Sequence, residues 1–317
     1  MKDKKIRLRM PKTGAIYAIV LFSVFYSILL HGQYLTLTNI VNVLRQSSTL
    51  CILSIAAFLT ILTHQLDLSV GYVASLSGIV LGMLMQAGYP LIVCLLLAVL
   101  SGTAIGALNG ILAGYTTIPP FIITLATMNI AKSLALILNS GTIAVNAPVL
   151  KMLNDLEIGF IPFPAILAVV LYLFFFWILK KRRYGVSMYA VGGKEEAALT
   201  AGINVKWTKA SVYLISGTLA GLAGVVYAVR LNSANPTAGA GLELDAICAV
   251  VLGGTALTGG QGSIWGAYLG AIAIYMLRNG MNMMGIRIIE QMTVIGAVLI
   301  LILAFDVFNR RKEAKKA

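Results

Sequence analysis

Long, uninterrupted apolar runs recur along this chain, and they restrict its possible folds more than any other feature. The runs 91–112, 161–179 and 288–305 approach or exceed the roughly 20 residues that a helix needs to cross a bilayer core. Charged residues make up 11 % of the sequence, whereas soluble domains carry about 25 %. The runs are too long and continuous for the alternating strands of a membrane barrel. We therefore expect an all-α polytopic membrane protein.

Glycine, proline and charged residues divide the apolar sequence into segments. We expect about ten transmembrane helices, near 14–31, 45–63, 68–88, 91–114, 118–138, 160–179, 208–230, 243–258, 263–279 and 287–307. An even number of crossings places both termini on the same side of the membrane. The connections on the other side would be 32–44, 89–90, 139–159, 231–242 and 280–286. No fixed-period repeat or low-complexity linker divides the chain, so residues 1–317 are expected to form one transmembrane domain.

Basic residues gather in three blocks, at residues 1–12, 180–183 and 310–316. Cytoplasmic connections of membrane proteins carry an excess of Lys and Arg, so we expect both termini and the connection 180–207 to be cytoplasmic. The net charge of +13 does not indicate nucleic-acid binding, because the basic residues lie at segment ends and not in a patch interleaved with aromatic residues. The first apolar run lacks a small-residue cleavage site and is expected to be a retained helix.

The sequence carries no pattern that is typical of an enzyme or a metal site. The only histidines, His31 and His64, have no carboxylate, Cys or second His at ligand or triad spacing. Cys51, Cys94 and Cys248 lie inside apolar runs and are expected to be packing residues. We therefore expect neither catalysis nor a bound metal.

A phosphate-binding loop of the form G-x-x-x-x-G-K-[ST] is also missing, so the chain is not expected to bind ATP itself. Gly253-Gly254-Thr255 and Gly259-Gly260-Gln261-Gly262 instead predict tight turns or close helix packing. Any energy from ATP would have to be supplied by a partner.

The connection 180–207 contains the sequence YAVGGKEEAALTAGINV. Helix-forming residues lie between Gly193 and Gly202, and Glu195 and Glu196 are in the first turn, where the helix dipole favours acids. A helix of about ten residues is roughly 15 Å long, too short and here too polar to cross the bilayer. We expect a short cytoplasmic helix near 193–203, in a connection that is longer than a simple turn requires.

The stretch Glu196-Ala197-Ala198-x-x-x-Gly202 is similar to the EAA loop of ATP-binding-cassette (ABC) importer permeases, whose coupling helix sits in a cleft of the ATPase subunit. The resemblance implies that an ABC ATPase contacts Gly193, Glu195, Glu196, Ala197, Ala198 and Gly202. The Ile-x-Leu-Pro tail of the wider signature is missing after Gly202, which leaves the docking residues there undefined.

Three further stretches resemble the ribose-type monosaccharide importer permeases, in order and over nearly the whole chain. They are DLSVG at 67–71, PPFIITL at 119–125, and 231–266, which includes PTAG and VVLGGT. The resemblance implies a permease of the bacterial plasma (inner) membrane that works as a dimer, with a second copy or a close paralogue, and that forms the translocation path at the dimer seam. It also implies ABC ATPase subunits that use ATP and Mg, a soluble sugar-binding protein, contact with membrane lipid, and no cofactor bound by this chain. The sugar stays open between ribose, another pentose or hexose, and a furanosyl signalling molecule.

Ionisable residues within the apolar runs are candidates for the path, because a charge at mid-bilayer costs roughly 2.5–3.5 kcal/mol on insertion scales. Such residues are Asp67, Lys132, Glu243 and Asp245. We expect the helix to break at Asp67, which either organises a narrow part of the path or caps the segment that starts at 68.

On segment 118–138, Lys132 either lines the path together with Asn129, one turn earlier, or pairs with a carboxylate. Phe121 and Thr124 are path residues only by the family resemblance. The candidate substrate path therefore comprises Asp67, Ser69, Phe121, Thr124, Asn129 and Lys132.

An ion-coupled secondary transporter of a small polar solute is the alternative function. It would need no ATPase and would place its ionisable residues in matched halves of the chain. The absence of an inverted-repeat signal and the presence of the helix expected at 193–203 favour the ATP-driven importer.

Overall fold

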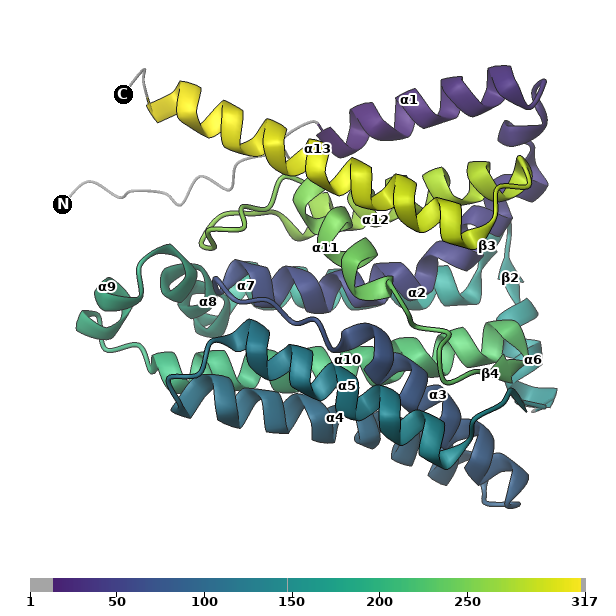
Figure 1. The fold of residues 1–317 in the computed structure, drawn as a ribbon, viewed down its shortest axis with the longest axis horizontal. Helices are drawn as coiled ribbons and strands as arrows, with labels where there is room; N and C mark the ends of the chain where they lie inside the picture. The colour runs from purple at the N-terminus through teal and green to yellow at the C-terminus, as the bar shows by residue number, and fades with distance from the viewer. Residues whose placement is uncertain (1–13, 147, 315–317) are drawn as a thin grey trace.

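The computed structural model describes residues 14–146 and 148–314 as a bundle of helices (Figure 1). Most helices run roughly along the long axis of the molecule, which is horizontal in that view. Of the three basic blocks, residues 1–12 lie outside the described residues, as do residues 315 and 316 of the last block.

The first half of the chain is built from helices joined by short connections. They are α1 (Gly14–Leu29), the 3-10 helix η1 (Gln33–Leu35), α2 (Leu37–Leu62), α3 (Val70–Gln86), α4 (Leu91–Tyr115), α5 (Pro120–Leu138) and α6 (Pro148–Asp155). The second half continues with α7 (Phe163–Lys181), α8 (Arg183–Gly193), α9 (Glu195–Thr200), α10 (Val205–Leu231), α11 (Leu242–Leu252), α12 (Ile264–Met283) and α13 (Ile288–Ala314).

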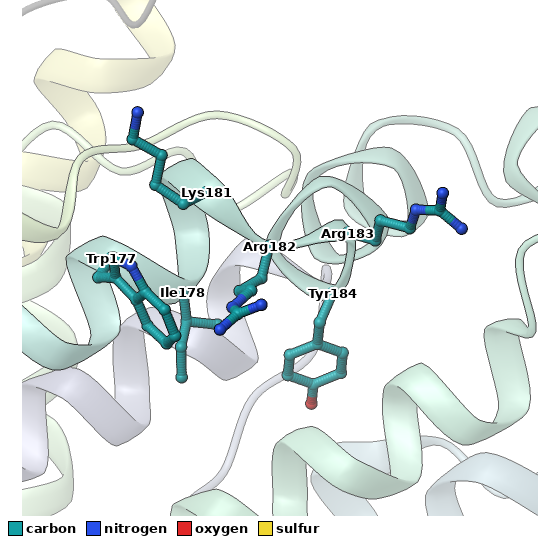
Figure 2. A pocket seen from close by; sticks show the side chains of 6 residues that line it. All are labelled: Trp177, Ile178, Lys181, Arg182, Arg183 and Tyr184. Carbon is teal, nitrogen blue, oxygen red and sulfur yellow. The ribbon is translucent and has the colours of Figure 1, made fainter.

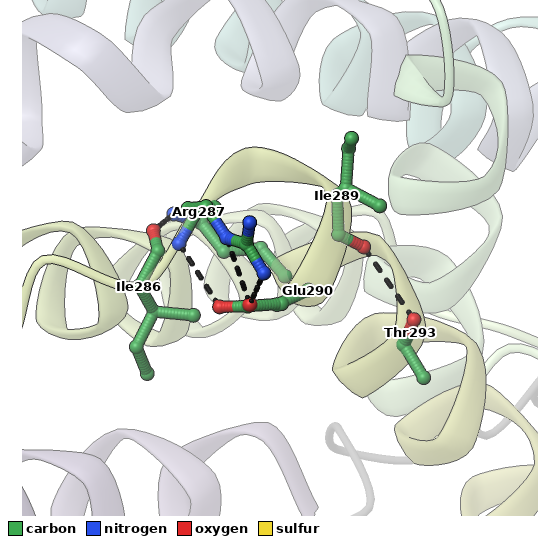
Figure 3. Close-up of polar contacts among 6 residues, drawn as sticks. Ile286, Arg287, Ile289, Glu290 and Thr293 are labelled. Atoms are coloured by element: carbon green, nitrogen blue, oxygen red, sulfur yellow. Dashed lines mark hydrogen bonds and ion pairs between the residues drawn. The ribbon is translucent and has the colours of Figure 1, made fainter.

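Local sequence signals explain where several of these helices begin. The side chains of Thr36 and Asn204 accept hydrogen bonds from the backbone N–H groups of Asn39 and Trp207, and so cap α2 and α10. Proline lies in the first turn of α5 and of α7, where its missing N–H leaves no helical hydrogen bond unmade. At the start of α13, the guanidinium of Arg287 forms an ion pair with Glu290 (Figure 3).

The expectation of ten transmembrane helices is not confirmed. Among the described residues, five helices are long and apolar enough to cross a membrane: α2, α4, α5, α7 and α10. Helices α1 and α3 are apolar but have only 16 and 17 residues. The bounds expected at 243–258 are wrong, because α11 ends at Leu252; its 11 residues are about half of what a single helix needs for a crossing.

Strands also appear, although the sequence predicts an all-α chain. β1 (Ile143–Ala144) pairs antiparallel with β4 (Ser233–Ala234), and β2 (Glu157–Ile158) pairs antiparallel with β3 (Ile161–Pro162). β1 and β4 form where the connections expected as 139–159 and 231–242 lie beside each other, whereas β2 and β3 form a tight β-hairpin at the end of the first connection. The first of these connections also holds α6, so it is more ordered than expected.

Helix α2 forms the centre of the bundle. Every residue from Ser47 to Leu62 is buried, and α7, α10, α11 and α12 pack around it. A helix that is enclosed on all sides must be apolar all round, and this explains why the stretch reads as a continuous membrane segment.

Helices α4 and α10 approach each other along a row of glycines. Gly102, Gly106 and Gly110 lie one turn apart on α4, and a Cβ on any of them would meet the backbone of α10. Small residues permit such close helix packing in membranes. The packing holds α10 against α4, and both helices carry polar side chains toward the centre of the bundle.

The two ends of the bundle differ in character (Figure 1). Helices α8 and α9 lie at the end where α13 finishes, at the left of the view. The short strands and α6 lie at the opposite end. The basic residues 180–183 therefore share one end of the molecule with the C-terminal part of α13.

Candidate functional site

A break separates α2 from α3 inside the bundle, and Asp67 organises it. Residues 63–69 are not helical, and Asp67 is 3 % exposed. Its Oδ1 accepts hydrogen bonds from the backbone N–H and the hydroxyl of Ser69, at 2.9 and 2.6 Å. Its Oδ2 accepts one from the hydroxyl of Ser216 on α10, at 2.7 Å. Asp67 thus lies in a helix break, and it also binds the N-terminal end of the next helix.

The hydrogen bonds continue from the break to two more helices. The side-chain amide of Asn109 on α4 donates to the Ser69 hydroxyl at 3.0 Å. The hydroxyl of Thr127 on α5 donates to the Asn109 carbonyl oxygen at 2.7 Å. All of these side chains are buried. A continuous buried network, which we call the Asp67 network, therefore joins α10, the break, α4 and α5.

The backbone of the break is also hydrogen-bonded. The carbonyl oxygen of Leu66 accepts hydrogen bonds from the hydroxyls of Tyr213 at 3.0 Å and Thr124 at 3.4 Å. Non-helical backbone at membrane depth requires such partners because lipid offers none. Thr124, one of the expected path residues, therefore contacts the break directly.

Gln65 is the polar residue of the break that the sequence interpretation missed. It is 5 % exposed, and neither its amide nitrogen nor its carbonyl oxygen has a hydrogen-bond partner among the described residues. The sequence did offer one signal for Gln65, since it lies two residues from Asp67 within the expected break. A buried amide without partners is costly unless a further group binds it.

A second interrupted segment meets the first near the centre of the bundle. Residues 235–241 form turns before α11, and a Cβ on Gly239 would meet the backbone of Gly71 at the start of α3. The N–H of Gly239 donates to the Ser75 hydroxyl at 2.7 Å. The buried carboxylate of Glu243 accepts from the N–H of Gly241 and lies beside Gly71. It is thus close to the N-terminal ends of both α3 and α11, where helix dipoles favour a negative charge.

Asp245 belongs to a separate ion pair. Its carboxylate is 2.6 Å from the guanidinium of Arg278 on α12. Nearby, Arg230 donates to the hydroxyl of Tyr275, which donates to Gln46. The sequence interpretation missed Arg230 and Arg278. Both are ionisable residues in apolar segments, which is the signal that identified Asp245.

The remaining path candidates lie on α5 and do not join the Asp67 network. Phe121 and Asn129 are exposed, and the Asn129 amide donates to the carbonyl oxygen of Leu125. The ammonium of Lys132 lies 5.4 Å from the ring centre of Tyr72 on α3. The ion pairs found among the described residues do not include Lys132, so the structure gives it an aromatic neighbour where a carboxylate was the alternative.

The connection 180–207 forms two helices, α8 and α9, where one helix near 193–203 was expected. Helix α9 covers only Glu195–Thr200. It ends because Gly202 has φ +77° and the backbone N–H groups of Gly202 and Ile203 bond back to Leu199 and Ala198.

The expected coupling residues divide into an exposed and a buried set. The exposed set is Gly193, Glu195, Glu196, Ala197 and Gly202. Glu195 also binds Lys209 on α10 at 2.8 Å. Ala198 is 2 % exposed and packs with Val191 and Val205. Ala198 therefore attaches α9 to its neighbours, and the exposed residues form the surface that a partner could contact. We call α8 and α9 together the hairpin; Gly193 lies at the turn between the two helices, and Gly202 follows α9.

Two glycine-containing segments, the end of α8 and the loop after α11, meet the end of α2. A Cβ on Gly192, at the end of α8, would collide with the carbonyl oxygen of Leu62 and the nitrogen of Gly260. The N–H of Gly260 donates to the same Leu62 carbonyl at 2.8 Å. We call this contact the glycine junction. A Cβ on the adjacent Gly259 would meet His64 of the break, so α8, the loop after α11 and the break are in direct contact.

The loop that contributes Gly260 has the predicted tight turns. Gly254, Gly259 and Gly260 have positive φ values of 86°, 76° and 67°, which glycine adopts without strain. The hydroxyl of Tyr189 on α8 donates to the carbonyl oxygen of Gly262 at 3.1 Å. Burial raises the pKa of Tyr189 to about 12, so this donor keeps its proton at physiological pH.

The structure also places the cysteines and the possible metal-binding side chains. Within the described ranges, no group of three or more His, Cys, Asp or Glu side chains could hold a metal ion. Cys51, Cys94 and Cys248 are buried free thiols.

The chain is similar in sequence to known transport permeases. Residues 39–303 match the family model described as the permease component of branched-chain amino acid transport systems. The chain is 36 % identical over 309 residues to a ribose import permease protein of Bacillus subtilis strain 168, covering 96 % of this chain and 94 % of the relative. It is 35 % identical over 298 residues to a D-allose transport system permease protein of Escherichia coli strain K12, covering 93 % and 91 %.

A more distant relative is a xylose transport system permease protein of Haemophilus influenzae, 31 % identical over 365 aligned residues, with 94 % of this chain and 96 % of the relative covered. No solved structure matches the chain. The relatives are transport permeases and not enzymes, and they carry no support for the ion-coupled alternative.

Proposed function

The chain belongs to this family of transport-system permease components, and we propose that it is the membrane subunit of an ATP-driven sugar importer of the bacterial plasma membrane. Full-length similarity to ribose, D-allose and xylose permeases is the observation that carries the proposal. The family description names branched-chain amino acids, so the family alone does not select a sugar; the choice rests on the relatives.

The chemistry of the break suits a neutral, hydroxyl-rich substrate. The side chains that surround it are mainly hydroxyls and amides, and the one carboxylate, Asp67, already accepts three hydrogen bonds. The amide of Gln65 has both donor and acceptor capacity to spare. A sugar hydroxyl, which donates and accepts, is a suitable partner for it. Which sugar is carried stays open.

A second copy of the chain completes the path in this proposal. One face of α5 packs on α3 and α4, while Asn129 and Ser133 on the other face are exposed. Polar side chains that face lipid are unfavourable. We therefore place the second copy opposite this face, so that Phe121, Asn129 and Lys132 line the seam between the two copies.

The ATPase binds, in this proposal, to the exposed residues of α9. Both termini and the connection 180–207 face the cytoplasm, and a soluble sugar-binding protein delivers sugar at the opposite end, where the short strands and α6 lie. Closure of the ATPase would move α9 and α8, and the glycine junction would pass that movement to the break at Asp67. ATP and Mg bind to the ATPase and not to this chain.

The test is sugar uptake by vesicles that contain the permease, its ATPase and its binding protein. Uptake should require ATP on the side of the vesicle membrane that corresponds to the cytoplasm. A proton gradient alone should not drive it. Reversing the charge of the exposed Glu196 to Lys should reduce ATPase binding and uptake together, whereas Asp155→Lys, an exposed charge reversal at the opposite end, should leave ATPase binding intact. Uptake driven by a proton gradient without ATP would reject the proposal.

A further inference from the structure

A hollow lies at the corner where α7 ends and α8 begins (Figure 2). It has a volume of about 720 Å³ and is lined by Trp177, Ile178, Lys181, Arg182, Arg183 and Tyr184. The guanidinium of Arg182 lies 4.1 Å from the ring centre of Trp177. Figure 2 shows this guanidinium between Trp177 and Tyr184, while Lys181 and Arg183 project away on either side. Arg182 is therefore the cation inside the hollow.

The charge at this corner is not neutralised by the chain itself. Four basic residues follow one another at 180–183, and the ion pairs recorded for residues 14–146 and 148–314 involve none of them. Stacking on Trp177 orders the guanidinium of Arg182 but leaves its N–H groups free, since a ring face accepts no fork of hydrogen bonds. A planar guanidinium with free N–H groups is suited to bind phosphate oxygens in pairs.

An apolar surface leads away from the hollow along α7. Val170, Leu173, Phe174 and Trp177 are 44–53 % exposed and share one face of the helix, because they are spaced by three or four residues. On the other side, the Tyr184 hydroxyl bonds to Ser211 on α10 at 2.6 Å, next to the exposed Leu214. The cation thus lies at the end of a lipid-facing surface.

We propose that this hollow binds an anionic phospholipid, with its phosphodiester on Arg182 and an acyl chain along the exposed face of α7. A basic site at the cytoplasmic end of membrane helices is suited to such headgroups, and a tryptophan is favoured at the depth where headgroup and chains meet. The proposal rests on the membrane placement given above but on neither the sugar nor the ATPase.

Native mass spectrometry of the detergent-solubilised chain, titrated with phosphatidylglycerol or phosphatidylcholine, tests the site. The two lipids can carry the same acyl chains, so a preference for phosphatidylglycerol reports the headgroup charge. Arg182→Gln should weaken phosphatidylglycerol binding about fivefold, as expected for one basic residue that contributes about 1 kcal/mol near an anionic surface. Lys206→Gln is the control, since it removes one positive charge from an exposed side chain on α10 that does not line the hollow, and it should change binding less than twofold.

Three outcomes would overturn the proposal: equal binding of the two lipids, equal losses in the two variants, or competition by soluble glycerophosphoglycerol at the concentrations at which the lipid itself binds. The last result would assign the site to a free phosphoester. Thermal unfolding of both variants shows whether they are folded, and Arg182→Lys, which keeps the charge but loses the stacked fork, should bind more strongly than Arg182→Gln. Equal binding of the two lipids by the unmodified chain, together with ATP-driven uptake, would reject this site and leave the proposed function standing.

Discussion

Asp67 contributes to this fold mainly as an acceptor of hydrogen bonds. Three donors converge on its two oxygens, and through Ser69 and Asn109 it is connected to α5. A proton relay needs partners that change protonation. The neighbours of Asp67 in the network are hydroxyls and an amide, which do not titrate at physiological pH. We infer that Asp67 holds the break in shape.

Asp67→Asn should therefore retain much of the transport, because the amide keeps the shape and one acceptor oxygen, and hydroxyls can reverse their hydrogen bonds. Asp67→Leu should lose folding or assembly, since it leaves buried donors on Ser69 and Ser216 unpaired at a cost of about 1–3 kcal/mol each. The measurement is ATP-driven uptake by reconstituted vesicles at several external pH values, beside the expression level. Background uptake by Asp67→Asn with normal expression would contradict the structural role.

The sequence predicted Asp67 better than it predicted the groups around it. An acid between apolar runs, followed by Ser and Gly, signals a break without any knowledge of tertiary structure. Ser216 and Asn109 are ordinary residues in apolar segments, and their role arises only because α10 and α4 pack closely enough to bring them to the break. For Lys132, the sequence identified the charged residue but not its partner, because its neighbour Tyr72 lies on another helix.

At the scale of elements, apolar content alone does not identify which helices cross the membrane. Helix α11 is buried among α2, α3, α12 and α13, and this burial is sufficient to account for its apolar residues. Hydropathy does not distinguish these two situations. The contact between the hairpin and the loop after α11 could not be predicted from the sequence either. The glycine pairs at 192–193 and 259–260 signal turns, but only the fold brings the two pairs into contact.

The glycine junction offers a test with a matched pair of substitutions. Gly192 and Gly193 both end α8, yet a Cβ on Gly192 would collide with backbone of Leu62 and Gly260, whereas a Cβ on Gly193 meets nothing within 4 Å. Alanine is favoured over glycine in helices by about 0.5–1 kcal/mol. Gly193→Ala should therefore leave thermal stability unchanged or slightly raised. Gly192→Ala should destabilise the protein by about 1–3 kcal/mol, the usual cost of overpacking.

The melting temperatures of the two purified variants give this comparison directly, and uptake measures its effect on coupling. If Gly192→Ala melts at the same temperature as Gly193→Ala, the three segments do not meet as described. If it melts lower but transports normally with ATP, the junction is structural and the proposed route from α9 to the break is wrong.

For the whole molecule, orientation is the first prediction. Cysteine at position 194 on the hairpin and at position 151 on α6 would mark the two ends of the bundle, since both lysines that they replace are exposed. In a background without Cys51, Cys94 and Cys248, an impermeant thiol reagent should label Lys151→Cys in intact cells and Lys194→Cys only after permeabilisation. The three basic blocks predict this result, and the reverse labelling would invert the proposed topology.

The second prediction for the whole molecule concerns the dimer seam. Helix α5 and helix α7 both expose apolar residues, as a lipid-facing helix does, but only α5 exposes Asn129 and Ser133 among them. Because such polar side chains are unfavourable against lipid, we expect another protein surface or the substrate path to face them.

A two-fold axis brings identical residues of two copies close together near the seam. Asn129→Cys should therefore yield cross-linked dimers with a short homobifunctional thiol reagent in membranes, whereas Leu173→Cys on the exposed face of α7 should not. Each variant must first show expression and uptake near the wild-type level, so that the comparison is made on folded permease. Cross-linking through position 173 and not through 129 would move the seam to α7, and it would also cover the surface that we assign to lipid.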